Sequence, residues 1–173
     1  MKYKEELIKN ANLMVTKGKG ILAADESTPT CMKRFTSIGV DSTEVKRNEY
    51  RDLLLTTPNM EDYISGVIFY DETLRQSTVK DNTPFTTHLL DKGVIPGIKV
   101  DMGAKVLSGH EDEKVTEGLD GLRERLTEYH KMGARFAKWR AVITIADGIP
   151  SKACYKANAH ALARYASLCQ EAG

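Results

Sequence analysis

Four short apolar segments, each closed by charged residues, constrain the fold of this chain more than any other feature. They are GILAADE at 20–26, GVIFYDE at 66–72, GIKVD at 97–101 and ARFAKWR at 134–140. Short apolar runs of this kind are typical of buried strands. A buried strand does not need acids and lysines at its end in order to fold, whereas α/β proteins build their active sites at the carboxyl ends of parallel strands. The pattern therefore predicts a functional site at one edge of a parallel sheet.

Amphipathic segments alternate with these strands. Helices are expected at about 4–16, 43–54, 85–92, 120–132 and 152–171, and a long polar loop at about 103–117. The order is a helix followed by four strand–helix units, with strands recurring at intervals of roughly 30–46 residues, as in βαβ proteins. The sequence thus predicts an α/β fold in a single domain, 1–173.

Two α/β architectures fit this order: an open doubly wound sheet and a closed barrel. A dinucleotide-binding doubly wound sheet carries GxGxxG after its first strand, but here the strand is followed by Asp-Glu-Ser-Thr at 25–28. A (β/α)8 barrel has eight strands in about 250 residues, so four units correspond to half of one. The last residues, 170–173, have the form of a helix C-cap. The chain is therefore expected to stop where a fifth strand would begin.

The composition argues against several classes of protein. The formal net charge of +1 gives no field that would attract nucleic acid or an anionic membrane, and the apolar runs are far shorter than the ~20 residues of a membrane span. The N-terminus lacks the apolar region of a signal peptide, so a cytoplasmic location is expected. Three cysteines and four histidines show no metal-ligand spacing, and neither a metal nor another cofactor is expected.

Charged residues at alternate strand positions share a face of the sheet. Lys138 and Arg140 stand in this relation on the last strand, and Lys99 and Asp101 on the strand before it. Where such strands are neighbours, their cations and acids meet at one mouth, which suits phosphate binding and a lysine held for proton transfer. Each residue alone is better explained as part of a salt bridge. Four charged strand ends together favour a functional site.

The first strand leads into Asp25-Glu26-Ser27-Thr28. A carboxylate at this position is suited to take a proton from a substrate hydroxyl. Ser27 and Thr28 either donate hydrogen bonds to a phosphate or cap the following helix. Lys33 and Arg34 come a turn or two later, where one of them would reach an anion.

Five segments resemble class I fructose-1,6-bisphosphate aldolases, in the same order along nearly the whole chain. They are 18–28, 97–101, 116–122, 134–140 and 162–167. The resemblance implies a TIM barrel, of which this chain covers the N-terminal helix and the first four βα units. It also implies a glycolytic and gluconeogenic lyase that cleaves fructose 1,6-bisphosphate to dihydroxyacetone phosphate and glyceraldehyde 3-phosphate through a lysine Schiff base, without a metal. A homotetramer is implied in the same way.

The resemblance also implies roles for individual residues. Asp25 resembles the aspartate that handles the proton of the substrate C4 hydroxyl, and Lys138 resembles the second active-site lysine, which assists proton transfer and contacts substrate. The residues that resemble contacts to the sugar and its phosphates are Ser27, Arg34, Arg47, Lys99 and Arg140. Arg47 lies on an expected helix and is also consistent with a plain surface charge. Asp71 and Glu72 receive no role.

The sequence departs from the family at two points. Met102 stands where the family usually has lysine, which removes a charge beside the site. The family's fifth strand supplies a glutamate that acts as acid and base, and its sixth supplies the Schiff-base lysine; these 173 residues hold neither strand. The chain alone is therefore expected to be inactive. The alternatives are another Schiff-base aldolase of the same fold and a non-catalytic half barrel that acts as a binding or scaffold protein.

Overall fold

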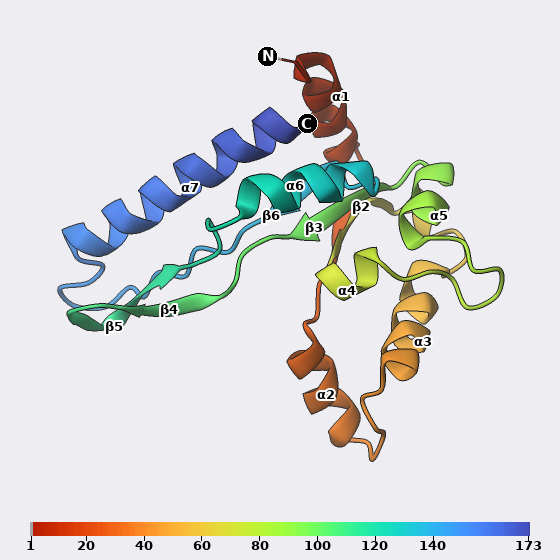
Figure 1. The fold of residues 1–173 in the computed structure, drawn as a ribbon, viewed down its shortest axis with the longest axis horizontal. Helices are drawn as coiled ribbons and strands as arrows, with labels where there is room; N and C mark the ends of the chain where they lie inside the picture. The colour runs from red at the N-terminus through yellow and green to blue at the C-terminus, as the bar shows by residue number, and fades with distance from the viewer. Residues whose placement is uncertain (1) are drawn as a thin grey trace.

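A four-stranded parallel sheet forms the centre of the structure, a computed structural model that describes residues 2–173 (Figure 1). Its strands are β1 (Gly20–Ala24), β2 (Ile64–Phe69), β3 (Ile95–Lys99) and β6 (Phe136–Lys138). They lie in the order β1-β2-β3-β6, and each pairs in parallel with the next. Because the spatial order follows the chain order without a reversal, the topology is that of a barrel segment and not of a doubly wound sheet.

Helices connect the strands. They are α1 (Lys4–Met14), α2 (Thr28–Thr36), α3 (Glu44–Leu55), α4 (Asp71–Leu74), α5 (Phe85–Asp91), α6 (Leu122–Lys131) and α7 (Lys152–Ala172), with a 3-10 turn η1 (Met60–Asp62). The five helices expected from the sequence are confirmed, and their ends agree within two residues. The short helices α2 and α4 follow β1 and β2. No helix within residues 2–173 is long and apolar enough to cross a membrane.

The hydrophobic core lies between one face of the sheet and the helices. Val67, Phe69 and Ile98 of the strands are completely or almost completely buried in it. The helices contribute buried side chains to the same core: Leu55, Phe85, Leu89, Leu122 and Leu126. The opposite face carries the alternate strand residues and is more open, since its Ile21 is 41% exposed. The charged strand ends belong to this second face.

The segment at 103–117 is a β-hairpin, so the prediction of a long loop was wrong. β4 (Ala104–Leu107) and β5 (His110–Thr116) pair antiparallel around a two-residue turn. Charged residues fill most of β5, which hides the strand from a pattern based on apolar alternation. Tertiary contacts stabilise it instead, since the buried Glu113 carboxylate accepts a hydrogen bond from the backbone amide of Ser151 at 2.5 Å.

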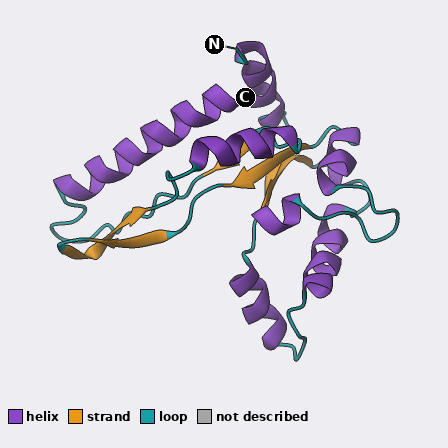
Figure 2. Cartoon of the chain, in the orientation of Figure 1, coloured by secondary structure: helices purple, strands orange, loops and turns teal. Residues whose placement is uncertain are grey.

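The hairpin and the N-terminal half of α7 form an arm that extends away from the four-stranded sheet, while the C-terminal half of α7 returns to the core (Figure 2). The side chain of Asn158 on α7 is almost completely buried and donates a hydrogen bond to the carbonyl of Lys114 at 2.9 Å. Large exposed apolar side chains of the arm and its connecting loop are Val106, Ile143, Ile145 and Tyr155. The arm therefore carries apolar surface that the rest of the chain does not cover.

Gly97 of β3 lies against the ring of Phe136 on β6. A Cβ atom at residue 97 would stand 2.3 Å from the ring's Cζ atom. Gly97→Ala should therefore displace the ring and lower the free energy of unfolding by about 1–3 kcal/mol. Urea unfolding with and without Phe136→Leu measures this as a double-mutant cycle. Gly97→Ala should lower the free energy of unfolding by less when residue 136 is leucine. An equal loss with phenylalanine and with leucine at that position would contradict this packing.

Candidate functional site

The structure brings the charged strand ends together at one edge of the sheet. Asp25 follows β1, Tyr70 follows β2, and Lys99 and Lys138 end β3 and β6. Asp25, Tyr70 and Lys99 line a cleft of about 540 Å³ at this edge. The carboxyl ends of four strands thus share one site, which is where a β/α barrel carries its functional groups.

One ion pair joins the two outermost strands of the sheet. Lys138 Nζ donates to Asp25 Oδ2 at 2.7 Å, with side chains that are 29% and 15% exposed. Strands β2 and β3 lie between the two partners, and neighbouring strands are about 4.8 Å apart. Side chains on the inner face of a curled sheet converge, and the length of lysine covers the remaining distance. The pair therefore depends on the curvature of the sheet.

Lys99 is held by a different acid. It is the register partner of Lys138 on the adjacent strand, and like charges opposite one another destabilise a sheet. Lys99 Nζ donates to both Oδ1 and the backbone carbonyl of Asp101, each at 2.7 Å. The buried Asp101 also accepts from the backbone amides of Gly103 at 3.2 Å and Arg140 at 3.3 Å. Each lysine at the site thus has its own carboxylate.

Ser27 and Arg34 also line the cleft. Ser27 is the N-cap of α2, yet its side chain makes no capping hydrogen bond, and its Oγ lies 3.1 Å from Oγ1 of Thr30. The half-exposed Arg34 guanidinium donates to the Glu26 carboxylate at 2.8 Å and to the Tyr50 hydroxyl at 2.9 Å. Hydroxyl and guanidinium groups are donors that suit a phosphate.

Three residues expected at the substrate do not line this cleft: Lys138, which contacts Asp25 beside it, Arg140 and Arg47. The side chain of Arg140 is exposed, while its backbone carbonyl accepts a hydrogen bond from Thr116 at 2.7 Å. Arg47 is nearly buried on α3, where its guanidinium donates to Glu72 at 2.6 and 2.9 Å and to the Ser42 carbonyl at 2.5 Å. For all three residues, contact with substrate stays a prediction.

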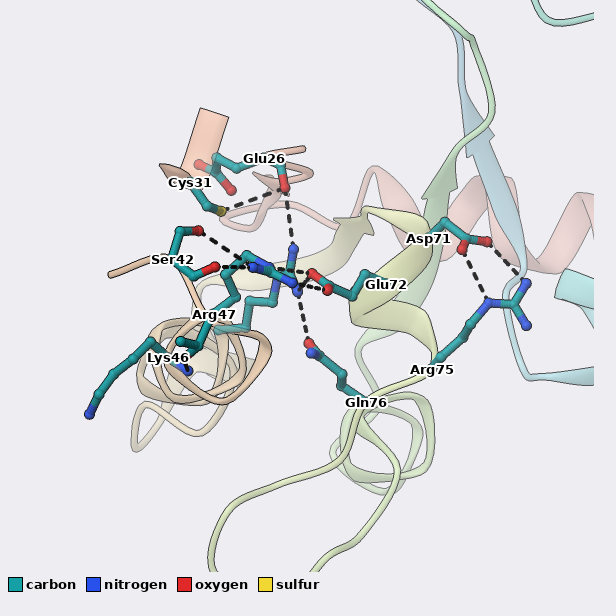
Figure 3. A network of polar contacts seen from close by, with 11 residues as sticks. Glu26, Cys31, Ser42, Lys46, Arg47, Asp71, Glu72, Arg75 and Gln76 are labelled. Carbon is teal, nitrogen blue, oxygen red and sulfur yellow. Dashed lines mark hydrogen bonds and ion pairs between the residues drawn. The ribbon is translucent and has the colours of Figure 1, made fainter. Parts of the chain in front are cut away.

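Glu72 is the centre of a charged cluster beside the cleft (Figure 3). Arg47 and Arg51, one turn apart on α3, both donate to its carboxylate, and Arg51 also donates to Gln76 Oε1 at 2.9 Å. The hydrogen bonds from Arg47, with those from Arg51, outweigh the effect of burial and lower the pKa of Glu72 to about 2. We refer to Arg47, Arg51, Glu72 and Gln76 as the arginine–glutamate cluster.

Asp71 has a separate structural role. It accepts two hydrogen bonds from Arg75, each at 3.1 Å (Figure 3). It accepts a third from the Tyr129 hydroxyl at 2.9 Å. Burial opposes its ionisation, but the hydrogen bonds from Arg75 and Tyr129 prevail and lower the pKa of Asp71. Asp71 therefore ties α4 to α6, and Glu72 ties α4 to α3.

Two contributors to the site had no assigned role in the sequence. The contact of Asp101 with Lys99 could have been predicted from the sequence, because Asp101 lies two residues after Lys99 and shares its face of the sheet. No sequence pattern predicts the contact of Arg51, because its partner Glu72 is 21 residues away on another helix. Within residues 2–173, no group of three or more histidine, cysteine, aspartate or glutamate side chains is arranged to hold a metal ion.

Comparisons with known proteins identify the family and the fold of the chain. A family model for class I fructose-bisphosphate aldolase matches residues 6–173. A protein of Xanthomonas campestris pv. campestris, named probable fructose-bisphosphate aldolase class 1, is 62% identical over 169 residues, which are 98% of this chain and 50% of that protein. The cytoplasmic isozyme 1 of fructose-bisphosphate aldolase from Pisum sativum is 52% identical over 172 residues, 99% of this chain and 48% of the pea protein.

A solved structure has the same fold. The fructose-bisphosphate aldolase of Plasmodium falciparum, in a ternary crystal with TRAP and a small-molecule inhibitor, is 47% identical and superposes with a TM-score of 0.93. The match covers 99% of this chain and 50% of that one. The chain thus spans about half the length of the relatives that it matches, and the parallel strands form part of a TIM barrel.

Glu72 gives the stability of the chain a specific dependence on pH. Its pKa of about 2 in the folded state lies below the ordinary value of 4.5, so its contribution is fully present above pH 4.5 and is lost as the pH falls toward 2. Glu72→Gln should lower the free energy of unfolding by about 1–3 kcal/mol at pH 7. Urea unfolding between pH 7 and pH 3 should show this difference shrink in acid. A difference that stays constant with pH would refute the assignment.

Proposed function

This chain belongs to the class I fructose-bisphosphate aldolase family, and we propose that it forms the N-terminal half of an enzyme that cleaves fructose 1,6-bisphosphate into dihydroxyacetone phosphate and glyceraldehyde 3-phosphate. The observation that carries the proposal is the Asp25–Lys138 ion pair, at 2.7 Å beside the cleft where the strands end. A carboxylate and an ammonium group in contact suit a reaction that moves a proton to and from a sugar hydroxyl. The complete enzyme would comprise this chain and the remaining half of the barrel.

Asp25 acts in the proposed reaction as the base for the C4 hydroxyl. As its carboxylate takes the hydroxyl proton, the C3–C4 bond breaks, an aldehyde forms at C4, and the bonding electrons pass to an iminium at C2. The Lys138 ammonium donates to the Asp25 carboxylate, so it can release one of its own protons onward and then take up the proton that Asp25 has received. Only 15% of the Asp25 side chain is exposed, and exclusion of water strengthens this interaction.

The lysine that forms the iminium is proposed to come from the other half of the barrel. A Schiff-base lysine attacks as the neutral amine. Lys99 and Lys138 are instead paired with Asp101 and Asp25, each at 2.7 Å. Because both lysines contact carboxylates, neither is placed to attack the substrate ketone. This supports a Schiff-base lysine on a strand beyond these four.

The phosphates are proposed to be held by donors around the cleft. Ser27, Arg34 and Lys99 line it and supply hydroxyl, guanidinium and ammonium groups. Met102 also lines the cleft and is largely exposed. Its thioether provides no cation, so Arg34 and Lys99 would carry more of the charge neutralisation at this side.

We further propose a cytoplasmic homotetramer. The pea relative is named a cytoplasmic isozyme, and a tetramer is implied by resemblance to the family. The arm offers apolar surface for such contacts, since Ile145 is 85% exposed and Val106 is 61% exposed.

Asp25→Asn and Lys138→Met should each lower kcat of the complete enzyme by about 100- to 10,000-fold, because each removes a group that moves or stabilises the proton. A coupled assay for triose phosphate formation measures turnover, and urea unfolding measures stability, which should change much less. Turnover within twofold of the parent enzyme in either variant would rule out the assigned roles.

Trapping with borohydride in the presence of dihydroxyacetone phosphate tests the Schiff base. Reduction should fix the triose covalently to one lysine of the complete enzyme, and peptide mapping should place it outside residues 2–173. An adduct on Lys99 or Lys138 would contradict the proposed division of labour between the two halves. An enzyme that forms no adduct and cleaves no substrate would favour the non-catalytic alternative.

A further inference from the structure

The turn that carries Asp25 has little backbone support of its own. The β1–β2 ladder ends at the pair Ala24 and Phe69, and α2 begins at Thr28. Asp25 and Glu26 lie between these two elements. The direction in which Asp25 points must therefore be fixed by side chains that contact this turn from elsewhere.

Arg51 contacts the turn at the peptide between Glu26 and Ser27, one residue after Asp25. Its Nη2 atom donates to the backbone carbonyl of Glu26 at 3.5 Å, and the buried thiol of Cys31 lies 3.8 Å from the same carbonyl. The Arg51 side chain is only 3% exposed, so water does not compete freely for this bond. Figure 3 shows the Glu26 carbonyl at the end of the arginine–glutamate cluster.

The charges of the cluster explain why Arg51 reaches the turn. Two guanidinium groups share one carboxylate, that of Glu72, so a positive charge is left over. Arg47 directs its remaining donor to the Ser42 carbonyl. Arg51 directs two further hydrogen bonds to neutral oxygens, those of Gln76 and Glu26. A buried guanidinium is stable only when its donors are satisfied in this way.

We propose that Arg51 is a positioning residue for the aldol cleavage: through the Glu26 carbonyl it holds Asp25 in the orientation that meets Lys138. The inference rests on the proposed function, since it assigns a partner to the proposed base. Lysine cannot replace Arg51, because one ammonium group does not reproduce the planar fork that serves Glu72, Gln76 and Glu26 together.

The first test compares kcat with KM for Arg51→Lys in the complete enzyme. Misplacement of Asp25 should lower kcat at least about tenfold, whereas KM should change much less, because Lys99 lies outside this turn and keeps its contact with Asp101. Asn158→Ala is the control: it removes a buried hydrogen bond in the arm, away from the cleft, and should lower stability while kcat is kept. Equal losses of kcat in the two variants would overturn the proposal.

The second test does not depend on activity. Hydrogen exchange followed by mass spectrometry should show at least about tenfold faster exchange in a peptide spanning 25–31 of Arg51→Lys, with β3 unchanged. Unchanged exchange in 25–31 would overturn the positioning role. If Arg51→Lys does not fold, Arg51→Gln replaces it in both the kinetic and the exchange measurements. A parent enzyme without aldol cleavage would defeat the proposed function alone, since the exchange result still decides whether Arg51 fixes the turn.

Discussion

The Asp25–Lys138 ion pair is the interaction on which the rest of the site depends. It connects the first strand of the sheet with the last, across two intervening strands, at 2.7 Å. This distance is reached only because the sheet curls and brings its inner face together. The pair thus links the fold to the chemistry: the same curvature that makes a barrel segment brings a base and an ammonium group into contact.

Charge balance organises the remainder of the site. Lys99 and Lys138 are register partners on neighbouring strands, and each is given a carboxylate of its own. Beside the cleft, the arginine–glutamate cluster departs from this one-to-one pairing, since Glu72 serves two arginines. The excess charge of that cluster is directed to backbone and amide oxygens, one of which belongs to the turn that carries Asp25. The Glu26 carbonyl therefore links the arginine–glutamate cluster to the turn that carries the proposed base, Asp25.

The sequence predicts the sheet and the strand-end site because both leave local signals. Apolar runs closed by charges mark the four strands, and the alternate positions of Lys99 and Asp101 predict their shared face. The β4–β5 hairpin escapes prediction because its strands are charged and are stabilised by α7, through contacts such as Glu113 with Ser151. The partners of Asp71 and Glu72 escape it for the same reason, since Tyr129 and Arg51 lie on distant segments of the chain. Long-range side-chain pairing leaves no local pattern.

A crystal structure of the complete enzyme with the reduced Schiff-base adduct of fructose 1,6-bisphosphate tests the central claim most directly. The account predicts an Asp25 carboxylate oxygen within about 2.6–3.2 Å of the substrate C4 oxygen, with Lys138 still beside it. A C4 oxygen bound by other groups, with Asp25 turned away from the substrate, would contradict the claim that the strand-end pair performs the proton transfer.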